Sequence, residues 1–203
     1  MRGPATVRTS FTCMPAAERV AAVILAGGQG SRMGGADKGL VEYRGRPLIE
    51  WTLDVLRPQV DELVISANRN LDTYAAYGPR VLPDTLPDYP GPLAGILTAM
   101  QSVTADWLAV VPCDTPHLPA DLVARLLHAA RQAHVPLAIA ADDTHTHHTC
   151  FIVRIDQRDA LAAFLARGER AVRRWQAELP STTVQFDAAA FANLNRPDDL
   201  SGS

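Results

Sequence analysis

Residues 20–38 read V-A-A-V-I-L-A-G-G-Q-G-S-R-M-G-G-A-D-K, and this stretch decides the fold. The unbroken apolar run over residues 20–26 is typical of a strand that is buried on both faces. Glycines and small polar residues follow it and lead to two cations, Arg32 and Lys38. Glycine lets successive backbone N–H groups point at phosphate oxygens. We therefore expect a buried strand that feeds a phosphate-binding loop, with the cations supplying positive charge.

The loop does not match the two standard phosphate motifs. A dinucleotide fingerprint G-x-G-x-x-G starting at Gly28 needs glycine at position 33, where Met33 stands. The Gly-Lys-Ser/Thr of a P-loop is also missing. A glycine turn that serves packing alone would leave Arg32 and Lys38 unexplained. Lys38 is the better candidate of the two, because a lysine binds phosphate as a compact point charge.

Apolar runs alternate with helical periodicity along the rest of the chain. Strands that alternate with helices predict an α/β fold, here a three-layer α/β/α arrangement around a mostly parallel sheet. After the first strand, strands are predicted at residues 62–67, 80–82, 107–111, 136–141, 149–154 and 183–187. Helices are predicted at residues 47–58, 72–77, 93–103, 119–134, 157–166 and 170–178.

Polar or glycine residues stand at or just beyond the ends of several predicted strands. They are the Gly27–Gly28 pair, Asn68, Asp84 and Asp114. Ligands of open α/β sheets bind outside the carboxyl ends of the strands. The sequence therefore predicts that these residues, although distant in sequence, line one cleft.

Composition excludes several classes of function. The 203 residues carry a net charge of −3, and the Lys and Arg residues are scattered, so we expect no binding to nucleic acid or to an anionic membrane. No apolar run reaches membrane-spanning length. The three cysteines are odd in number and widely spaced, which indicates no disulfide framework and favours the cytoplasm.

The chain is long enough for one substantial domain and too short for two ordinary ones. We expect residues 1–18 to form a disordered N-terminal tail and residues 19–203 to form a single domain. The tail is basic and lacks acids until Glu18, a feature of transit peptides, but it shows no helical face and no apolar segment for secretion.

The segment L-A-G-G-Q-G-S-R-M-G-G-A-D-K-G-L, residues 25–40, resembles the signature of the molybdenum cofactor guanylyltransferases of the nucleotidyltransferase superfamily. The resemblance covers the chain from Val20 to Leu200, because A-N-R, V-L-P-D, D-Y-P-G-P-L-A-G, P-C-D-T-P, H-x-T, G-E-R and N-x-N-x-P-D follow in the family's order. It implies the Rossmann-like nucleotide-diphospho-sugar transferase fold. It also implies transfer of GMP from GTP to the terminal phosphate of molybdenum-loaded molybdopterin, with release of pyrophosphate.

The resemblance assigns roles to particular positions. It implies nucleotide binding by Leu25, Ala26, Gly27, Gly28, Lys38, Asn68, Asp84 and Asp114. It implies catalytic roles for Arg32, Lys38 and Asp114, with Mg²⁺ as the cofactor on Asp114. On the pterin side it implies His147, Asn193 and Asn195. Gly27 replaces the alanine of cytidylyl relatives, and the extra room suits a purine.

Four positions keep alternative interpretations. The family often has asparagine where this chain has Ser66, so a nucleotide contact there is left open. Asp114 precedes Thr-Pro and could simply cap a turn. His145 and His147 have the alternation of two zinc ligands on one strand, although the sequence identifies no further ligand.

Two rival functions remain open at this stage. One is another nucleotidyltransferase, which uses CTP with the same pterin or acts on a sugar 1-phosphate. The other is a non-catalytic carrier of nucleotide or cofactor. The expected partners are GTP and molybdenum-molybdopterin, and delivery to apo-molybdoenzymes or contact with other cofactor-biosynthesis proteins would be an added activity.

Overall fold

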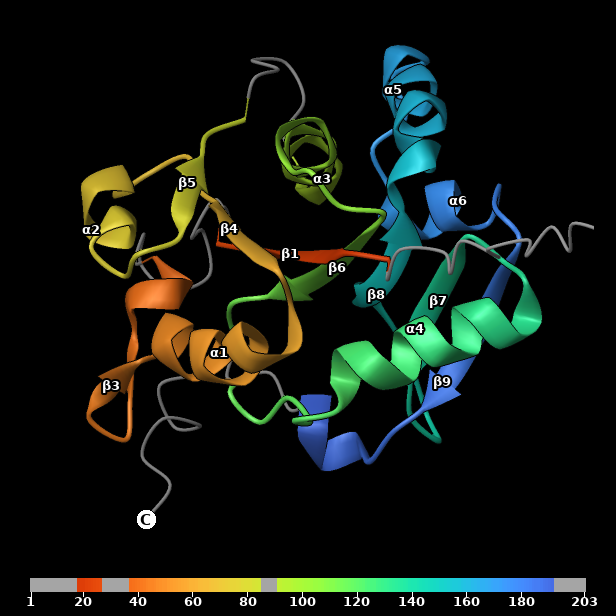
Figure 1. Ribbon diagram of the computed structural model, residues 1–203. Helices are drawn as coiled ribbons and strands as arrows, with labels where there is room; N and C mark the ends of the chain where they lie inside the picture. Colours follow the sequence, from red (N-terminus) through yellow and green to blue (C-terminus); the bar gives the residue numbers. More distant parts are fainter. Residues whose placement is uncertain (1–17, 27–36, 85–90, 192–203) are drawn as a thin grey trace, which may run out of the picture.

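The computed structural model describes residues 18–26, 37–84 and 91–191 (Figure 1). Its main sheet has seven strands in the order β5-β4-β1-β6-β8-β7-β9. Along the chain these strands are β1 (Val20–Leu25), β4 (Glu62–Ser66), β5 (Arg80–Leu82), β6 (Trp107–Pro112), β7 (Leu137–Ala141), β8 (Thr146–Arg154) and β9 (Ser181–Gln185). All neighbouring strands pair in parallel except β8, which is antiparallel to β6 and to β7. The predicted α/β class and mostly parallel sheet are confirmed.

The direction of β8 has a simple cause. Only residues 142–145 join β7 to β8, and a parallel crossover needs a much longer connection. The chain must therefore turn back as a hairpin. Strand β8 also begins at Thr146, earlier than the predicted residue 149.

Helices cover both faces of the sheet (Figure 1). They are α1 (Leu48–Leu56), α2 (Leu71–Ala75), α3 (Pro92–Ser102), α4 (Leu122–Ala133), α5 (Arg158–Ala166) and α6 (Val172–Gln176). Strands β2 (Glu42–Tyr43) and β3 (Arg46–Pro47) form a separate hairpin. Short 3-10 turns occupy Lys38–Leu40, Arg57–Gln59, Ile155–Gln157 and Ala188–Phe191. Helix α6 is shorter than the predicted 170–178.

Strand β1 is buried on both faces, as its apolar run predicts. Ile24 packs into a core cluster with residues of α1 and α4, whereas Val23 packs into a second cluster with residues of α3 and α5. Figure 1 shows the same division, with α1 and α4 on one side of the sheet and α3, α5 and α6 on the other. The predicted three-layer arrangement is therefore confirmed.

The strand register brings several strand ends to one edge of the sheet. Leu25, the last residue of β1, pairs with Ser66 of β4 and with Pro112 of β6, and Ser66 pairs with Leu82 of β5. The end of β7 and the start of β8 lie at the same edge, because Ala141 pairs with Thr146. We call this side of the sheet the carboxyl edge. No helix within the described ranges is long and apolar enough to cross a membrane.

Candidate active site

Lys38 and Asp114 meet at the carboxyl edge. Lys38 opens a 3-10 turn at the end of the predicted loop, and Asp114 follows β6 closely. The Lys38 Nζ donates to Asp114 Oδ2 at 3.0 Å, and the two side chains are 32% and 14% exposed. Two of the predicted catalytic residues, far apart in sequence, thus form one partly sheltered ion pair.

Asn68 and Asp84 form a second pair at this edge. The Asn68 Nδ2 donates to Asp84 Oδ2 at 2.8 Å, and the Asp84 backbone N–H donates to Asn68 Oδ1 at 2.8 Å. Asp84 Oδ1 is buried and has no hydrogen-bond partner among the described residues. A buried acceptor without a partner costs about 1–3 kcal/mol. A hydrogen bond to this oxygen would remove that cost.

Ser66 ends β4, and its side chain faces α3 close to Asp84. It is only 4% exposed, and a Cβ on Gly95 of α3 would collide with its hydroxyl. The same Cβ would lie 3.3 Å from Asp84 Oδ1. Gly95 therefore allows α3 to approach the strand end where Asp84 sits.

The remaining predicted nucleotide contacts are only partly described. Leu25 is half-buried and Ala26 is buried, and the Ala26 N–H donates to the Ser66 carbonyl at 2.8 Å. Both residues therefore lie at the carboxyl edge, next to β4. The other predicted site residues that lie outside the described ranges are Gly27, Gly28, Arg32, Asn193 and Asn195.

His147 stands at the same edge, held by a network that the sequence interpretation missed. Its Nε2 is 2.8 Å from Asp142 Oδ2, and its ring stacks on Phe191 with centroids 4.1 Å apart. Asp142 Oδ1 accepts hydrogen bonds from the Thr144 hydroxyl and from the N–H groups of Thr144 and His145, each at 2.7 Å. The sequence signals this network only through the polar residues that follow the strand predicted at 136–141, which begin with Asp142.

The charge on Asp142 is stabilised by this network. Donation from the Thr144 hydroxyl and backbone N–H, and then from His145 and His147, holds the pKa of the Asp142 carboxyl well below its usual range. The carboxylate is therefore ionised at neutral pH, and it orients the His147 ring from one side.

Strand pairing places His147 and Asp114 at the same edge of the sheet. The pairs of β6 with β8 end where Val110 meets Phe151. Asp114 lies in the turn that follows β6, and His147 lies in the first part of β8.

Cys113 and His145 lie close in sequence to the site residues Asp114 and His147. Burial, with the charge of Asp114 nearby, raises the pKa of the Cys113 thiol, so the sulfur is not a thiolate nucleophile at neutral pH. The Nδ1 of His145 lies 2.7 Å from the Thr144 hydroxyl. Within the described ranges, no cluster of three or more His, Cys, Asp or Glu side chains could hold a metal ion.

Comparison with known proteins identifies the family. The profile described as "MobA-like NTP transferase domain" matches residues 22–182. The chain belongs to this family. The family member "Molybdenum cofactor guanylyltransferase" of Shewanella amazonensis is 45% identical over 90% of this chain and 94% of its own length. The resemblance stated from the motifs is confirmed, and this NTP transferase-family chain is an enzyme of the nucleotidyltransferase class.

Solved structures share the fold of this NTP transferase-family protein. Molybdopterin-guanine dinucleotide biosynthesis protein A from Archaeoglobus fulgidus superposes with a TM-score of 0.74 at 24% identity, covering 89% of this chain and 94% of that one. A Mycobacterium tuberculosis protein in complex with manganese superposes with a TM-score of 0.68 at 19% identity, covering 89% and 95%. These likenesses confirm the nucleotidyltransferase fold.

Proposed function

We propose that this enzyme transfers GMP from GTP to the terminal phosphate of molybdenum-loaded molybdopterin, which yields the guanine dinucleotide form of the cofactor and pyrophosphate. The observation that carries the proposal is the 45% identity to the Shewanella amazonensis guanylyltransferase, which extends over 94% of that protein. The ion pair of Lys38 with Asp114 at the carboxyl edge supports it, because phosphoryl transfer needs a phosphate-binding cation and a metal-binding carboxylate close together.

The reaction needs positioning and charge neutralisation more than covalent chemistry. An oxygen of the acceptor phosphate forms a bond to the α-phosphorus of GTP while the bond from that phosphorus to pyrophosphate breaks. Negative charge then grows on the departing pyrophosphate. Lys38, together with Arg32 and the N–H groups of the glycine loop, neutralises it. No residue of the chain becomes covalently attached.

Asp114 is suited to hold Mg²⁺. Within the described ranges its carboxylate has one partner, the Lys38 ammonium, which a nucleotide's phosphates can attract away. Mg²⁺ is usually bound through one or two carboxylates, phosphate oxygens and waters, so a single aspartate at this edge fits the ion. When bound, Mg²⁺ neutralises phosphate charge during the transfer. Lys38 keeps the Asp114 charge compensated before the ligand arrives.

The two halves of the carboxyl edge divide the substrates. Asn68 and Asp84 bind the nucleoside part of GTP. Asp84 Oδ1, which has no partner among the described residues, accepts a hydrogen bond from it. His147 contacts the acceptor from the β8 side, with Asn193 and Asn195 as further pterin contacts. From the sequence we expect Gly27 to favour a purine, and Leu25, Ala26 and Gly28 to contact the nucleotide.

The proposal extends to the domain organisation, the cellular location and the partners of the enzyme. We infer that residues 19–203 act as one domain and that the enzyme works in the cytoplasm, consistent with the unpaired, buried Cys113 and Cys150. Handover to apo-molybdoenzymes would follow synthesis. No nucleic acid or membrane partner is proposed.

A nucleotide-preference assay tests the function. Purified enzyme is mixed with molybdenum-loaded molybdopterin, Mg²⁺ and each of the four nucleoside triphosphates, and pyrophosphate release is measured. We expect release with GTP, whereas a clear preference for CTP would contradict the proposal and the role of Gly27. The absence of pyrophosphate release with every nucleotide would favour a carrier.

Substitution of Asp114 tests the metal site. Asp114→Ala should lower kcat by about 10²–10³-fold, because it removes an electrostatic contribution to the transition state. The matched control is Asp159→Ala, which removes an exposed carboxylate from α5 and should leave turnover unchanged. Full turnover of Asp114→Ala in Mg²⁺ would show that the metal is held elsewhere.

A further inference from the structure

A buried carboxylate stands immediately before Lys38. Asp37 is only 8% exposed, and both of its oxygens accept hydrogen bonds from the segment that follows β4. The Tyr74 hydroxyl donates to Asp37 Oδ1 at 2.5 Å, and the Asn70 Nδ2 donates to Asp37 Oδ2 at 3.1 Å. A buried charge is tolerated when it is hydrogen-bonded in this way. Asp37 is therefore tethered to residues that are far from it in sequence.

The tether is anchored in the core through Tyr74. The Tyr74 ring is 0% exposed and belongs to the core cluster that includes Ile24 of β1 and Ile49 of α1. Asn70 has φ 51° and ψ 37°, a left-handed conformation that asparagine adopts more readily than most residues. The Tyr74 donor is thus held in the core, whereas Asn70 is an exposed residue just before α2.

The same tyrosine also borders the residue on the other side of Lys38. A Cβ on Gly39 would lie 2.5 Å from the Tyr74 hydroxyl and 3.2 Å from its ring, so only glycine lets the backbone pass so close. Tyr74 therefore contacts the chain both before and after Lys38. The backbone of Lys38 has little freedom to shift relative to the core.

We propose that Tyr74 and Asn70 are positioning residues that hold the Lys38 ammonium where it meets the triphosphate of the substrate. This inference rests on the proposed function, because it takes the ligand of Lys38 to be the nucleotide. Lys38 reaches Asp114 at 3.0 Å from this tethered backbone. Neither Tyr74 nor Asn70 needs to touch the substrate.

The test compares affinities for GTP and GMP, because GMP lacks the β- and γ-phosphates that Lys38 neutralises. Tyr74→Phe keeps the buried ring and removes only the hydroxyl. We expect its Kd for GTP to rise by about tenfold, which is typical when a group that orients a ligand-binding residue is removed. Its Kd for GMP should stay nearly constant. The matched control is Tyr77→Phe, on the same segment, whose hydroxyl bonds to no described residue.

A second variant separates positioning from stability. Asn70→Gly keeps the left-handed backbone accessible and removes the amide that contacts Asp37. It should shift the ratio of GTP to GMP affinity in the same direction as Tyr74→Phe. If both variants lower the thermal unfolding temperature but leave this ratio unchanged, the tether is purely structural and the inference is wrong.

A double-variant cycle links the tether to Lys38 itself. In a Lys38→Ala background, Tyr74→Phe should change the affinity ratio no further, because the positioned group is gone. If Lys38→Ala alone leaves GTP affinity intact, the proposed role of Lys38 fails. If Lys38→Ala weakens GTP binding but Tyr74→Phe and Asn70→Gly do not, only the positioning inference fails.

Discussion

At the scale of single residues, Lys38 and Asp114 compensate each other's charge before any substrate binds. A partly buried charge without a partner would be costly, and their 3.0 Å contact avoids this in both side chains. The phosphates and the metal ion that we propose as ligands offer each side chain a new partner of opposite charge. The site can therefore be preorganised without carrying two uncompensated charges.

Asp142 sets the orientation of His147 in a similar way, and Asp142→Asn tests it. The substituted side chain has only one oxygen to accept hydrogen bonds, so the contact with His147 or that with Thr144 weakens. We expect the KM for molybdopterin to rise by about tenfold while the KM for GTP changes little. Steady-state kinetics measure both, with Asp143→Asn on the neighbouring exposed residue as the control. An equal rise in both KM values would contradict the assignment of His147 to the acceptor.

The Asp142 carboxylate also makes stability depend on pH. Because its pKa is lower in the folded chain than its ordinary value, folding gains free energy that is fully present above about pH 4. This gain is lost as the pH falls toward the folded pKa. Urea denaturation should therefore find Asp142→Asn less stable than the native chain near neutral pH, with a smaller difference in acid. A difference that grows in acid would contradict the hydrogen-bond network.

At the scale of elements, α3 packs closely against the end of β4 next to Asp84. Alanine inside a helix is favoured over glycine by about 1 kcal/mol. Here the collision with the Ser66 hydroxyl opposes that gain. The close contact between helix and strand thus favours glycine at position 95, although alanine has the higher helix propensity.

Gly95→Ala measures this contact. We expect a net loss of about 1–3 kcal/mol in the free energy of unfolding, typical of an overpacked core, together with weaker GTP binding because Asp84 lies next to the new methyl group. Urea denaturation and nucleotide titration provide the two readings. Adding Ser66→Gly should restore much of both losses. If Gly95→Ala alone stabilises the chain, helix propensity outweighs the contact.

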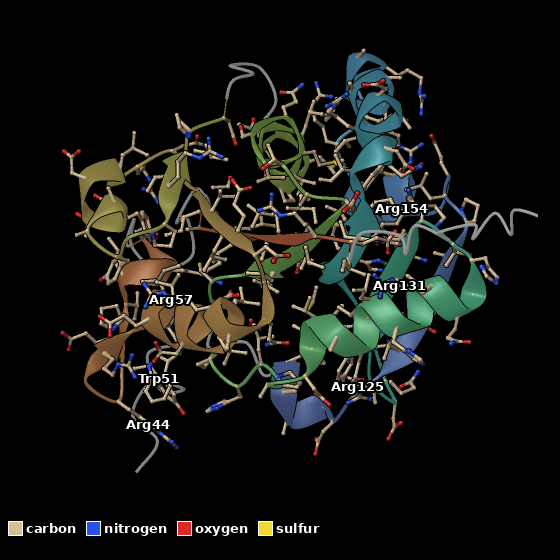
Figure 2. The ribbon with its side chains drawn as sticks, viewed as in Figure 1. Arg44, Trp51, Arg57, Arg125, Arg131 and Arg154 are labelled. Atoms are coloured by element: carbon tan, nitrogen blue, oxygen red, sulfur yellow. The ribbon has the colours of Figure 1, made fainter. Side chains whose placement is uncertain are left out.

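At the scale of the whole molecule, the two edges of the sheet have different roles. The carboxyl edge carries the proposed active site, and the opposite edge carries structural contacts. The edge opposite the site has a cavity of about 660 Å³ whose lining includes Glu18, Trp107, Arg131 and Arg154. Figure 2 shows Arg131 on α4 and Arg154 at the end of β8 on the same side of the molecule. Glu18 Oε2 accepts from the Arg131 Nε at 2.8 Å and from the Trp107 Nε1 at 3.2 Å. These contacts fasten Glu18, just before β1, to β6 and α4.

Arg131→Gln tests whether the contacts at the opposite edge are independent of the active site. Exposed ion pairs contribute little, so we expect the free energy of unfolding to fall by less than about 1 kcal/mol. Because Arg131 lies at the opposite edge from Lys38, kcat/KM for GTP should not change. Chemical denaturation and steady-state kinetics measure the two quantities. A clear loss of kcat/KM would mean that the two edges are coupled.

Much of the site could be predicted because its signals are local. The apolar run over residues 20–26 indicates a buried strand by itself, and Asn68, Asp84 and Asp114 each come within about three residues of the end of a predicted strand. Parallel strands then bring their carboxyl ends to one edge whatever the details of packing. The α/β class, the layers and the common edge therefore follow from patterns that need no knowledge of contacts.

Only the tertiary structure decided which residues distant in sequence pair with one another. The bonds from Tyr74 to Asp37, from Lys38 to Asp114 and between Asn68 and Asp84 join different crossovers, so no local pattern specifies them. The antiparallel course of β8, which carries His147 to the carboxyl edge, depends on the short connection after β7. The sequence by itself determined which residue types gather at this edge, because strand ends are encoded locally. Packing decided which of them touch, because distances between side chains depend on how the layers fit together.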